Sequence, residues 1–177
     1  ERRINGVPVA HLTGVREFWS LPLKVNDSTL IPRPDTEILV ETALTICLPD
    51  AKILDLGTGS GAIILALASE LPKTECYGID FSEQAVELAS DNAQCLNINN
   101  VFFKQSNWFE NVDDKFDLIV SNPPYIDEND KHLKQGDVRF EPLSALVASE
   151  NGLSDIRLIA TDARKYLKTD ASLMMEH

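Results

Sequence analysis

"KILDLGTGSGAIILALASEL", residues 52–71, decides the fold that we expect for this chain. Residues 52–56 are a short apolar run typical of a buried strand, and residues 61–71 are a longer apolar run typical of a helix. Between them stand Gly57, Gly59 and Gly61. Glycine adopts positive φ and lets a ligand approach the backbone closely. The stretch therefore predicts a strand, a tight glycine turn and a helix.

The alternation of strand and helix continues along the chain. We expect strands at 76–80, 101–104, 116–120 and 172–176, and helices at 31–47, 83–96 and 154–167, the last with Ser154 as its N-cap. Such alternation predicts an α/β fold, in which a mostly parallel sheet carries helices on both faces.

The N-terminal part has a different pattern. "VPVAHL" (7–12) and "EFWSLPLKV" (17–25) are β-like runs separated by Thr13 and Gly14, which predicts a β-hairpin. The chain stops on its last expected strand, so we expect both ends to be cut within a larger protein. Residues 1–33 would then be a hairpin and linker, and residues 34–177 the main domain.

Composition narrows the classes of function. The chain has 177 residues, of which 44% are hydrophobic and 25% charged, as in a globular domain. Its net charge of -12 disfavours stable nucleic-acid binding, and no apolar run is long enough for a membrane span. The three cysteines, Cys47, Cys76 and Cys95, lie in apolar stretches and favour buried free thiols in a reducing cytoplasm. The histidines show no metal-ligand spacing with them, so we expect no metal site.

Polar and aromatic residues follow four successive strands. In order, these are Gly57, Thr58, Gly59, Ser60 and Gly61; then Asp80; then Asn107 and Trp108; and finally Asn122, Pro123, Pro124 and Tyr125. The carboxyl ends of parallel strands meet at one edge of a sheet, where ligands bind. We therefore expect a ligand site at this edge.

Taken singly, these residues leave alternatives open. Gly57, Gly59 and Ala62 satisfy a relaxed dinucleotide fingerprint, so NAD is one candidate ligand. Asp80 stands where a carboxylate accepts both hydroxyls of a ribose, but it is also placed to cap the next helix, with Ser82 as the competing cap. The aromatic face of Trp108 suits either a purine or the core.

Several motifs together resemble a known family. "DLGTGSGA" (55–62), Asp80 and "NPPY" (122–125) are similar to the class I S-adenosylmethionine-dependent methyltransferases that act on amino groups. "LIPRPDTE" (30–37), "SNPPYID" (121–127) and "GDVRFEPLSAL" (136–146) resemble the protein-(glutamine-N5) methyltransferases of peptide-chain release factors, the HemK/PrmC family. This resemblance covers essentially the whole chain. It implies a Rossmann-like fold, and it also implies an N-terminal helical domain and a final hairpin, neither of which we expect within residues 1–177.

The resemblance also implies ligands and roles. The methyl donor would be S-adenosylmethionine, with S-adenosylhomocysteine as product, and the substrate the glutamine of a Gly-Gly-Gln motif in release factors. The implied cofactor-binding residues are Gly57, Thr58, Gly59, Ser60, Gly61, Asp80, Asn107, Trp108 and Asn122. The implied substrate-binding residues are Arg33, Asn122, Pro123, Pro124 and Tyr125, of which Asn122, Pro123 and Tyr125 are catalytic.

The chemistry explains why two prolines follow Asn122. A carboxamide nitrogen is a poor nucleophile with two donors and no free acceptor, so it needs two fixed acceptors. The side-chain oxygen of Asn122 and the carbonyl of Pro123 fit this need, and the prolines fix the backbone in advance. Tyr125 would pack over the planar amide and exclude water. We assign no general base, because the proton leaves after the nitrogen becomes cationic.

The chain departs from the family pattern at two places. Asn107 stands where the family commonly has Asp, and residues 169–171 (Thr, Asp, Ala) stand where it usually has a pair of glycines. Two roles also stay open. Arg33 and Glu37 either line the pocket or belong to an Arg–carboxylate pair that fastens the helix to the sheet.

Other functions share these motifs. A glutamine methyltransferase of a ribosomal protein is the nearest alternative. An adenine-N6 methyltransferase of nucleic acid shares "NPPY", because an exocyclic amine poses the same hydrogen-bonding problem, but the net charge opposes it. A cofactor-binding fragment without activity is the third.

Overall fold

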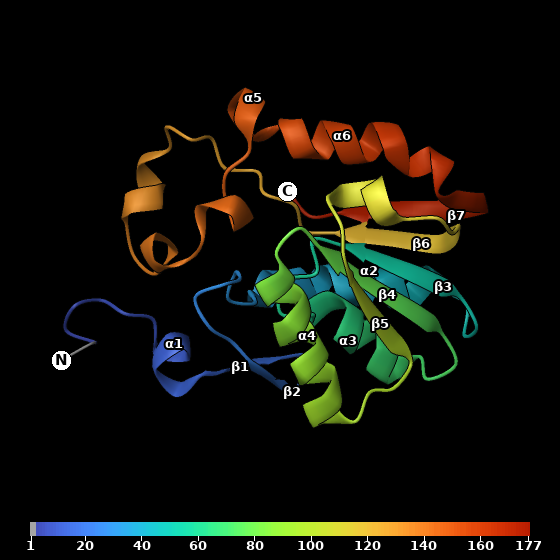
Figure 1. The fold of residues 1–177 in the computed structure, drawn as a ribbon, viewed down its shortest axis with the longest axis horizontal. Coiled ribbons are helices and arrows are strands. Elements are labelled where there is room, and N and C mark those ends of the chain that lie inside the picture. Colours follow the sequence, from blue (N-terminus) through green and yellow to red (C-terminus); the bar gives the residue numbers. More distant parts are fainter. Residues whose placement is uncertain (1–2) are drawn as a thin grey trace.

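A parallel sheet of five strands forms the centre of the computed structural model, which describes residues 3–177. Its order is β5-β4-β3-β6-β7, and every neighbouring pair is parallel. The strands are β3 (Lys52–Leu56), β4 (Glu75–Asp80), β5 (Val101–Gln105), β6 (Phe116–Ser121) and β7 (Leu167–Met175) (Figure 1). Successive strands run outward from β3 in one direction and then from β6 in the other, so the strand order reverses between β3 and β6.

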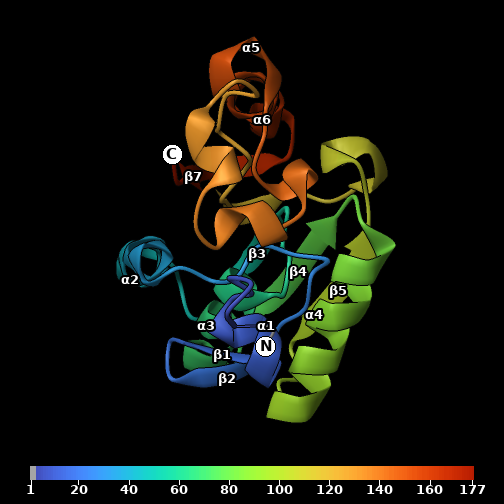
Figure 2. The same ribbon diagram turned by 90° about the vertical axis from the view of Figure 1, so that its left-hand side faces the viewer.

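Helices cover both faces of this sheet, which confirms the expected fold class. On one face lie α2 (Glu37–Ile46), α3 (Ala62–Glu70) and α4 (Glu83–Leu96), and on the other lies α6 (Ser154–Asp162) (Figure 2). Alternate strand residues point to opposite faces, so Ile53 belongs to the first core and Leu54 to the second.

The N-terminal hairpin is present, but its predicted turn was wrong. The strands are β1 (Val15–Phe18) and β2 (Leu21–Lys24), joined at Trp19 and Ser20 rather than at Thr13 and Gly14. The first predicted run instead forms a short helix, α1 (Val9–Thr13), which ends at Gly14 in the left-handed conformation.

Tertiary hydrogen bonds explain the position of this turn. Trp19 and Ser20 both have positive φ, as a tight two-residue hairpin turn requires. The backbone N–H of Trp19 donates to Glu37 Oε1 at 2.8 Å, and its indole N–H donates to Glu70 Oε1 at 2.9 Å. Bonds to α2 and α3 therefore stabilise a turn that its own residues do not favour. They also give Glu37 a structural role.

The last helix and strand differ from the prediction at their ends. Leu153, not Ser154, occupies the N-cap position of α6, because the chain enters the helix from α5 (Ser149–Gly152), a turn with left-handed residues. The helix ends at Asp162, and β7 already begins at Leu167. At Asp170 the strand has a φ of 60°, within the segment where the resemblance leads one to expect glycines.

Short 3-10 helices complete the fold. They are η1 (Pro34–Thr36), η2 (Trp108–Asn111), η3 (Lys131–Lys134), η4 (Val138–Phe140), η5 (Leu143–Ala145) and η6 (Ala163–Lys165). Three of them, η3 to η5, lie in the long segment between β6 and α5 (Figure 1).

The three cysteines differ in how deeply they are buried. Cys76 is buried and Cys47 half-buried, but Cys95 lies on the exposed side of α4, so burial of all three was a wrong expectation.

From residue 3 onward, none of the helices has the length and apolar character needed to cross a bilayer.

Candidate functional site

Three strands end in register at one edge of the sheet. Leu56 of β3 pairs with Ile79 of β4 on one side and with Ser121 of β6 on the other. The next residues, Gly57, Asp80 and Asn122, therefore lie side by side, Asp80 as the last residue of β4. This geometry brings together residues that lie 65 positions apart in sequence.

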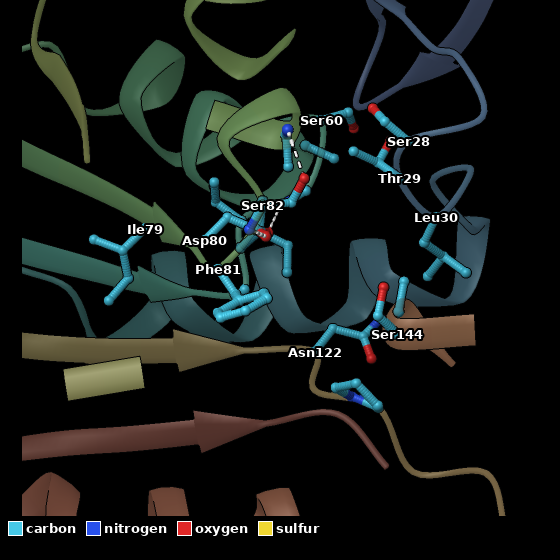
Figure 3. Close-up of a pocket in the computed structure, with 18 of the residues that line it drawn as sticks. Ser28, Thr29, Leu30, Ser60, Ile79, Asp80, Phe81, Ser82, Asn122 and Ser144 are labelled. Atoms are coloured by element: carbon cyan, nitrogen blue, oxygen red, sulfur yellow. Dashed lines mark hydrogen bonds between the residues drawn. The ribbon is translucent and has the colours of Figure 1, made fainter. Parts of the chain in front are cut away.

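A cavity of about 340 Å³ opens at this edge. Of the residues expected to bind ligands, those that line it are Gly57, Thr58, Gly59, Ser60, Asp80, Asn107, Trp108, Asn122 and Pro124. Those outside the lining are Arg33, Gly61, Pro123 and Tyr125. Figure 3 shows Asp80 and Ser60 at one side of the cavity and Asn122 at the other.

The Asp80 carboxylate holds the glycine turn in place. Its Oδ2 accepts from the backbone N–H of Gly59 and its Oδ1 from that of Ser82, both at 2.9 Å. The cap of α4 is Ser82, whose hydroxyl accepts from the N–H of Ala85. Asp80 is thus not the helix cap. Burial raises the pKa of Asp80, and the backbone donors oppose that rise. Each oxygen keeps a further lone pair for a ligand.

Trp108 lies against the glycine turn. Its ring is 3.6 Å from the place where a side chain at Gly57 would begin, an ordinary contact distance, so the φ of 72°, and not a lack of space, favours glycine at this position. Trp108 has a φ of 46°, and its carbonyl accepts from the Ser106 hydroxyl at 2.7 Å. The neighbouring Asn107 donates through Nδ2 to Glu110, which leaves its amide oxygen available. Both residues line the cavity.

The Asn122 amide has a defined orientation. Its Nδ2 donates to the hydroxyl of Thr36 at 3.3 Å. The side-chain oxygen is therefore left as the acceptor. Pro123 is buried, whereas the Tyr125 side chain is 42% exposed. Gly152 packs closely against the backbone of Tyr125, since a side chain at position 152 would begin 2.2 Å from the Tyr125 carbonyl oxygen.

Comparison with known proteins decides what kind of domain this is. A family model described as a methyltransferase domain matches residues 48–177. The chain belongs to this methyltransferase domain family.

Two curated relatives are similar along the entire chain. The release factor glutamine methyltransferase of Aliivibrio fischeri is 60% identical over 180 residues, covering 100% of this chain and 63% of that protein. The protein of the same name from Vibrio cholerae is 61% identical over 179 residues, covering 99% of this chain and 63% of its own length. The predicted resemblance is confirmed. The methyltransferase domain described here spans less than two thirds of the length of these relatives.

A solved structure supports the fold. A methyltransferase from Pyrococcus furiosus has a TM-score of 0.61 with this chain at 19% sequence identity, covering 94% of this chain and 72% of that one. The likeness confirms the Rossmann-like class I methyltransferase architecture.

Arg33 lies in an ion pair outside the cavity lining. Its guanidinium contacts Glu141 Oε2 at 2.5 Å, and the side chain of Glu141 is fully buried. The predicted Arg–carboxylate pair therefore exists, but its acid is Glu141 instead of Glu37. It joins the segment before α2 to η4 and η5. Glu141 lies 108 residues after Arg33, so the sequence around Arg33 could not indicate this partner.

The sequence prediction missed several residues that line the cavity. Phe81 follows Asp80 and is 71% exposed, and an apolar residue directly after a strand end was the available signal. Thr29, Ser144 and Asp155 come from segments remote in sequence, and no local pattern marked them. In Figure 3, Thr29 and Ser144 lie near the cavity from different parts of the chain.

A buried carboxyl, Asp55, lies beneath the glycine turn. Its Oδ2 accepts from the Thr58 hydroxyl at 2.7 Å, and its Oδ1 has no hydrogen-bond partner within residues 3–177. Burial raises the pKa of Asp55 from an ordinary value of 3.8 to about 7, against the effect of Thr58. Ionisation of this group in the folded protein is therefore costly.

We expect Asp55 to make stability fall with rising pH. Because its folded pKa lies above its unfolded pKa, the native state binds more protons between about pH 4 and pH 7. The free energy of unfolding should drop by about 2 kcal/mol from pH 5 to pH 7, and Asp55→Asn should remove most of this drop. Urea unfolding of both proteins at the two pH values measures it. An unchanged pH slope in the variant would contradict the assignment.

No metal-binding cluster was found in the described part of the chain: no three His, Cys, Asp or Glu side chains there are placed to hold an ion.

Proposed function

We propose that this chain transfers the methyl group of S-adenosylmethionine to the side-chain amide nitrogen of a glutamine, and that this glutamine belongs to the Gly-Gly-Gln motif of peptide-chain release factors. One observation carries the proposal. The Asn122 amide, with its oxygen left as acceptor, shares a cavity with Asp80 and the glycine turn. The 60% identity to a protein named release factor glutamine methyltransferase supports the choice of substrate.

The cavity suits S-adenosylmethionine in size and chemistry. About 340 Å³ lies within the range of small-molecule sites. Asp80 offers carboxylate lone pairs for ribose hydroxyls, and Phe81 and Trp108 offer apolar faces for a base. The buried hydroxyl of Thr29 lacks a partner among the described residues and suits a polar ligand group. When bound, S-adenosylmethionine supplies an electrophilic methyl group.

Asn122 and Pro123 orient the target amide. The NH2 group of glutamine has two hydrogens to donate, and the Asn122 side-chain oxygen and the Pro123 carbonyl are two acceptors on a stiff backbone. Both acceptors draw electron density toward the nitrogen, and their effect grows as positive charge develops there. Holding the nitrogen about 3–3.5 Å from the methyl carbon supplies much of the catalysis.

Tyr125 and the rest of the loop would close the site around the substrate. The exposed ring of Tyr125 is free to pack over a planar amide that enters from solvent. In this proposal Arg33 does not contact the substrate; its ion pair with Glu141 holds the segment before α2 in place beside the site. Residues 34–177 form the methyltransferase domain, preceded by the hairpin and linker of residues 1–33. A substrate from the translation machinery makes the cytoplasm the working compartment.

Mass spectrometry tests the proposed reaction. Full-length enzyme is incubated with recombinant release factor and isotope-labelled S-adenosylmethionine, and the Gly-Gly-Gln peptide is analysed. One labelled methyl group on the glutamine amide is the expected result, with none on a release factor whose glutamine is replaced by glutamate. The proposal fails if the release factor stays unlabelled while another substrate is methylated. Label on a ribosomal protein would favour the ribosomal-protein methyltransferase, and label on adenine in an oligonucleotide would favour the adenine-N6 methyltransferase.

Cofactor choice is tested by calorimetry. We expect S-adenosylhomocysteine to bind this chain and NAD not to bind, because Asp80 and the glycine turn share the cavity with Asn122, which a nicotinamide does not require. Titration of each ligand into the protein gives the two affinities. Heat from NAD with no response to S-adenosylhomocysteine would overturn the cofactor assignment.

A further inference from the structure

The segment 31–36, called the strap here, is anchored beside the cavity by one buried carboxylate. Glu141 Oε1 accepts from the backbone N–H of Ile31 at 2.8 Å, and its Oε2 contacts the Arg33 guanidinium. Pro32 and Pro34 flank Arg33 and restrict the backbone between these contacts. Neither Arg33 nor Glu141 lines the cavity. Their pair therefore fixes the course of the strap instead of contacting a ligand there.

The strap ends at Thr36, whose side chain reaches the site. Thr36 is buried, at 4% exposure, and lines the cavity. Its hydroxyl oxygen accepts from Asn122 Nδ2 at 3.3 Å, across 86 residues of sequence. An anchored strap thus holds the nitrogen end of the Asn122 amide.

We propose that Thr36 is a positioning residue that holds the Asn122 amide at the cavity through its nitrogen, with the oxygen end left for the substrate nitrogen. This rests on the proposed function. The two ends of an asparagine amide have nearly the same shape, so a half-turn about the last side-chain bond exchanges donor and acceptor. In the reversed orientation an NH2 group would face the NH2 group of the substrate, and neither could accept. Because a hydroxyl can both donate and accept, Thr36 fixes the place of the Asn122 amide, and the substrate NH2 group, which needs an acceptor, requires its oxygen end.

Substitution of the hydroxyl measures this role in the full-length enzyme. Thr36→Val keeps the shape of the side chain and removes its acceptor. We expect kcat to fall about tenfold, with KM for the release factor and Kd for S-adenosylhomocysteine within about twofold of wild type. Thr36→Ser restores the hydroxyl and should restore most of kcat. In an Asn122→Ala background, Thr36→Val should cause no further loss.

Thr42→Val is the matched control. Thr42 lies on the exposed side of the neighbouring helix α2, and its hydroxyl donates to the carbonyl of Ile38 within that helix. It should leave kcat unchanged. If Thr36→Val keeps wild-type kcat, or if Thr36→Ser loses as much as Thr36→Val, the positioning role is refuted.

An activity-independent measurement separates this inference from the proposed reaction. The side-chain amide NMR signal of Asn122, assigned by its disappearance in Asn122→Ala, should shift in Thr36→Val and return in Thr36→Ser. An Asn122 signal that ignores Thr36→Val refutes the contact, whatever the activity. If the signal responds as expected but wild-type enzyme does not methylate the glutamine, the proposed reaction fails while the Thr36 contact stands.

Discussion

Replacing Asn122 with alanine is expected to lower kcat by roughly 100-fold or more, with only a modest change in cofactor affinity. Asn122 lines the cavity, and its side-chain oxygen is left as an acceptor while Thr36 bonds the nitrogen. Its bond to the substrate amide strengthens as the nitrogen becomes cationic, so its loss weakens the transition state more than the ground state. Stability should fall by only about 1 kcal/mol, since one half-buried polar contact is lost.

Steady-state kinetics on full-length enzyme with a release factor substrate measure this effect, and thermal unfolding checks that the variant is folded. Asn99→Ala is the matched control. Asn99 is exposed, and within residues 3–177 its side chain bonds only the nearby Asn97 carbonyl, so kcat should not change. Near wild-type turnover in Asn122→Ala would reduce residues 122–125 to a stiff turn.

Asn122→Asp probes the same position more finely. Aspartate keeps an acceptor but loses the NH2 group that bonds Thr36 and adds a negative charge. We expect reduced kcat here as well, because the Thr36 contact can no longer orient the side chain in the same way.

Replacing Asp80 with alanine is expected to weaken binding of S-adenosylhomocysteine by about 2–3 kcal/mol, or roughly 30- to 150-fold in Kd. Two causes add. Bonds from ribose hydroxyls to a carboxylate are among the stronger neutral-to-charged hydrogen bonds. In addition, Asp80 accepts from the N–H of Gly59, so the variant loses a restraint on the glycine turn that lines the cavity.

Calorimetry with S-adenosylhomocysteine gives the change in Kd, with Glu83→Ala as the control. Glu83 is an exposed carboxylate in the first turn of α4 and does not line the cavity. Its removal changes the net charge near the site by the same amount and should leave Kd almost unaltered. Equal Kd for wild type and Asp80→Ala would mean that Asp80 does not bind the cofactor and has only a structural role, through its bonds with Gly59 and Ser82.

Short-range patterns in the sequence were enough to predict the sheet and the edge where the site lies. The helix predicted at 83–96 has the same bounds in α4, and the strand at 52–56 those of β3. Hydrophobic periodicity depends only on neighbours along the chain, so it survives without tertiary information. The parallel arrangement then follows from alternation, and with it the meeting of Gly57, Asp80 and Asn122.

Element ends were less predictable, because they depend on what lies nearby in space. The hairpin turn falls at Trp19 and Ser20 since Glu37 and Glu70 bond the Trp19 backbone and indole. The N-cap of α6 falls at Leu153 since a left-handed turn precedes it, and that turn packs Gly152 closely against the backbone of Tyr125. Neither cause is a property of the residues in the turn or at the cap.

The sequence by itself thus determined the α/β fold, the strand ends that bear Asp80 and Asn122, and the motifs that resemble those of glutamine methyltransferases. Only the tertiary structure decided that Arg33 pairs with Glu141 and that Thr36 holds the Asn122 amide. The physical reason is the distance along the chain over which each kind of information acts. Periodicity records which face of an element is buried, whereas the partner of a polar side chain is set by packing across 86 to 110 residues of chain.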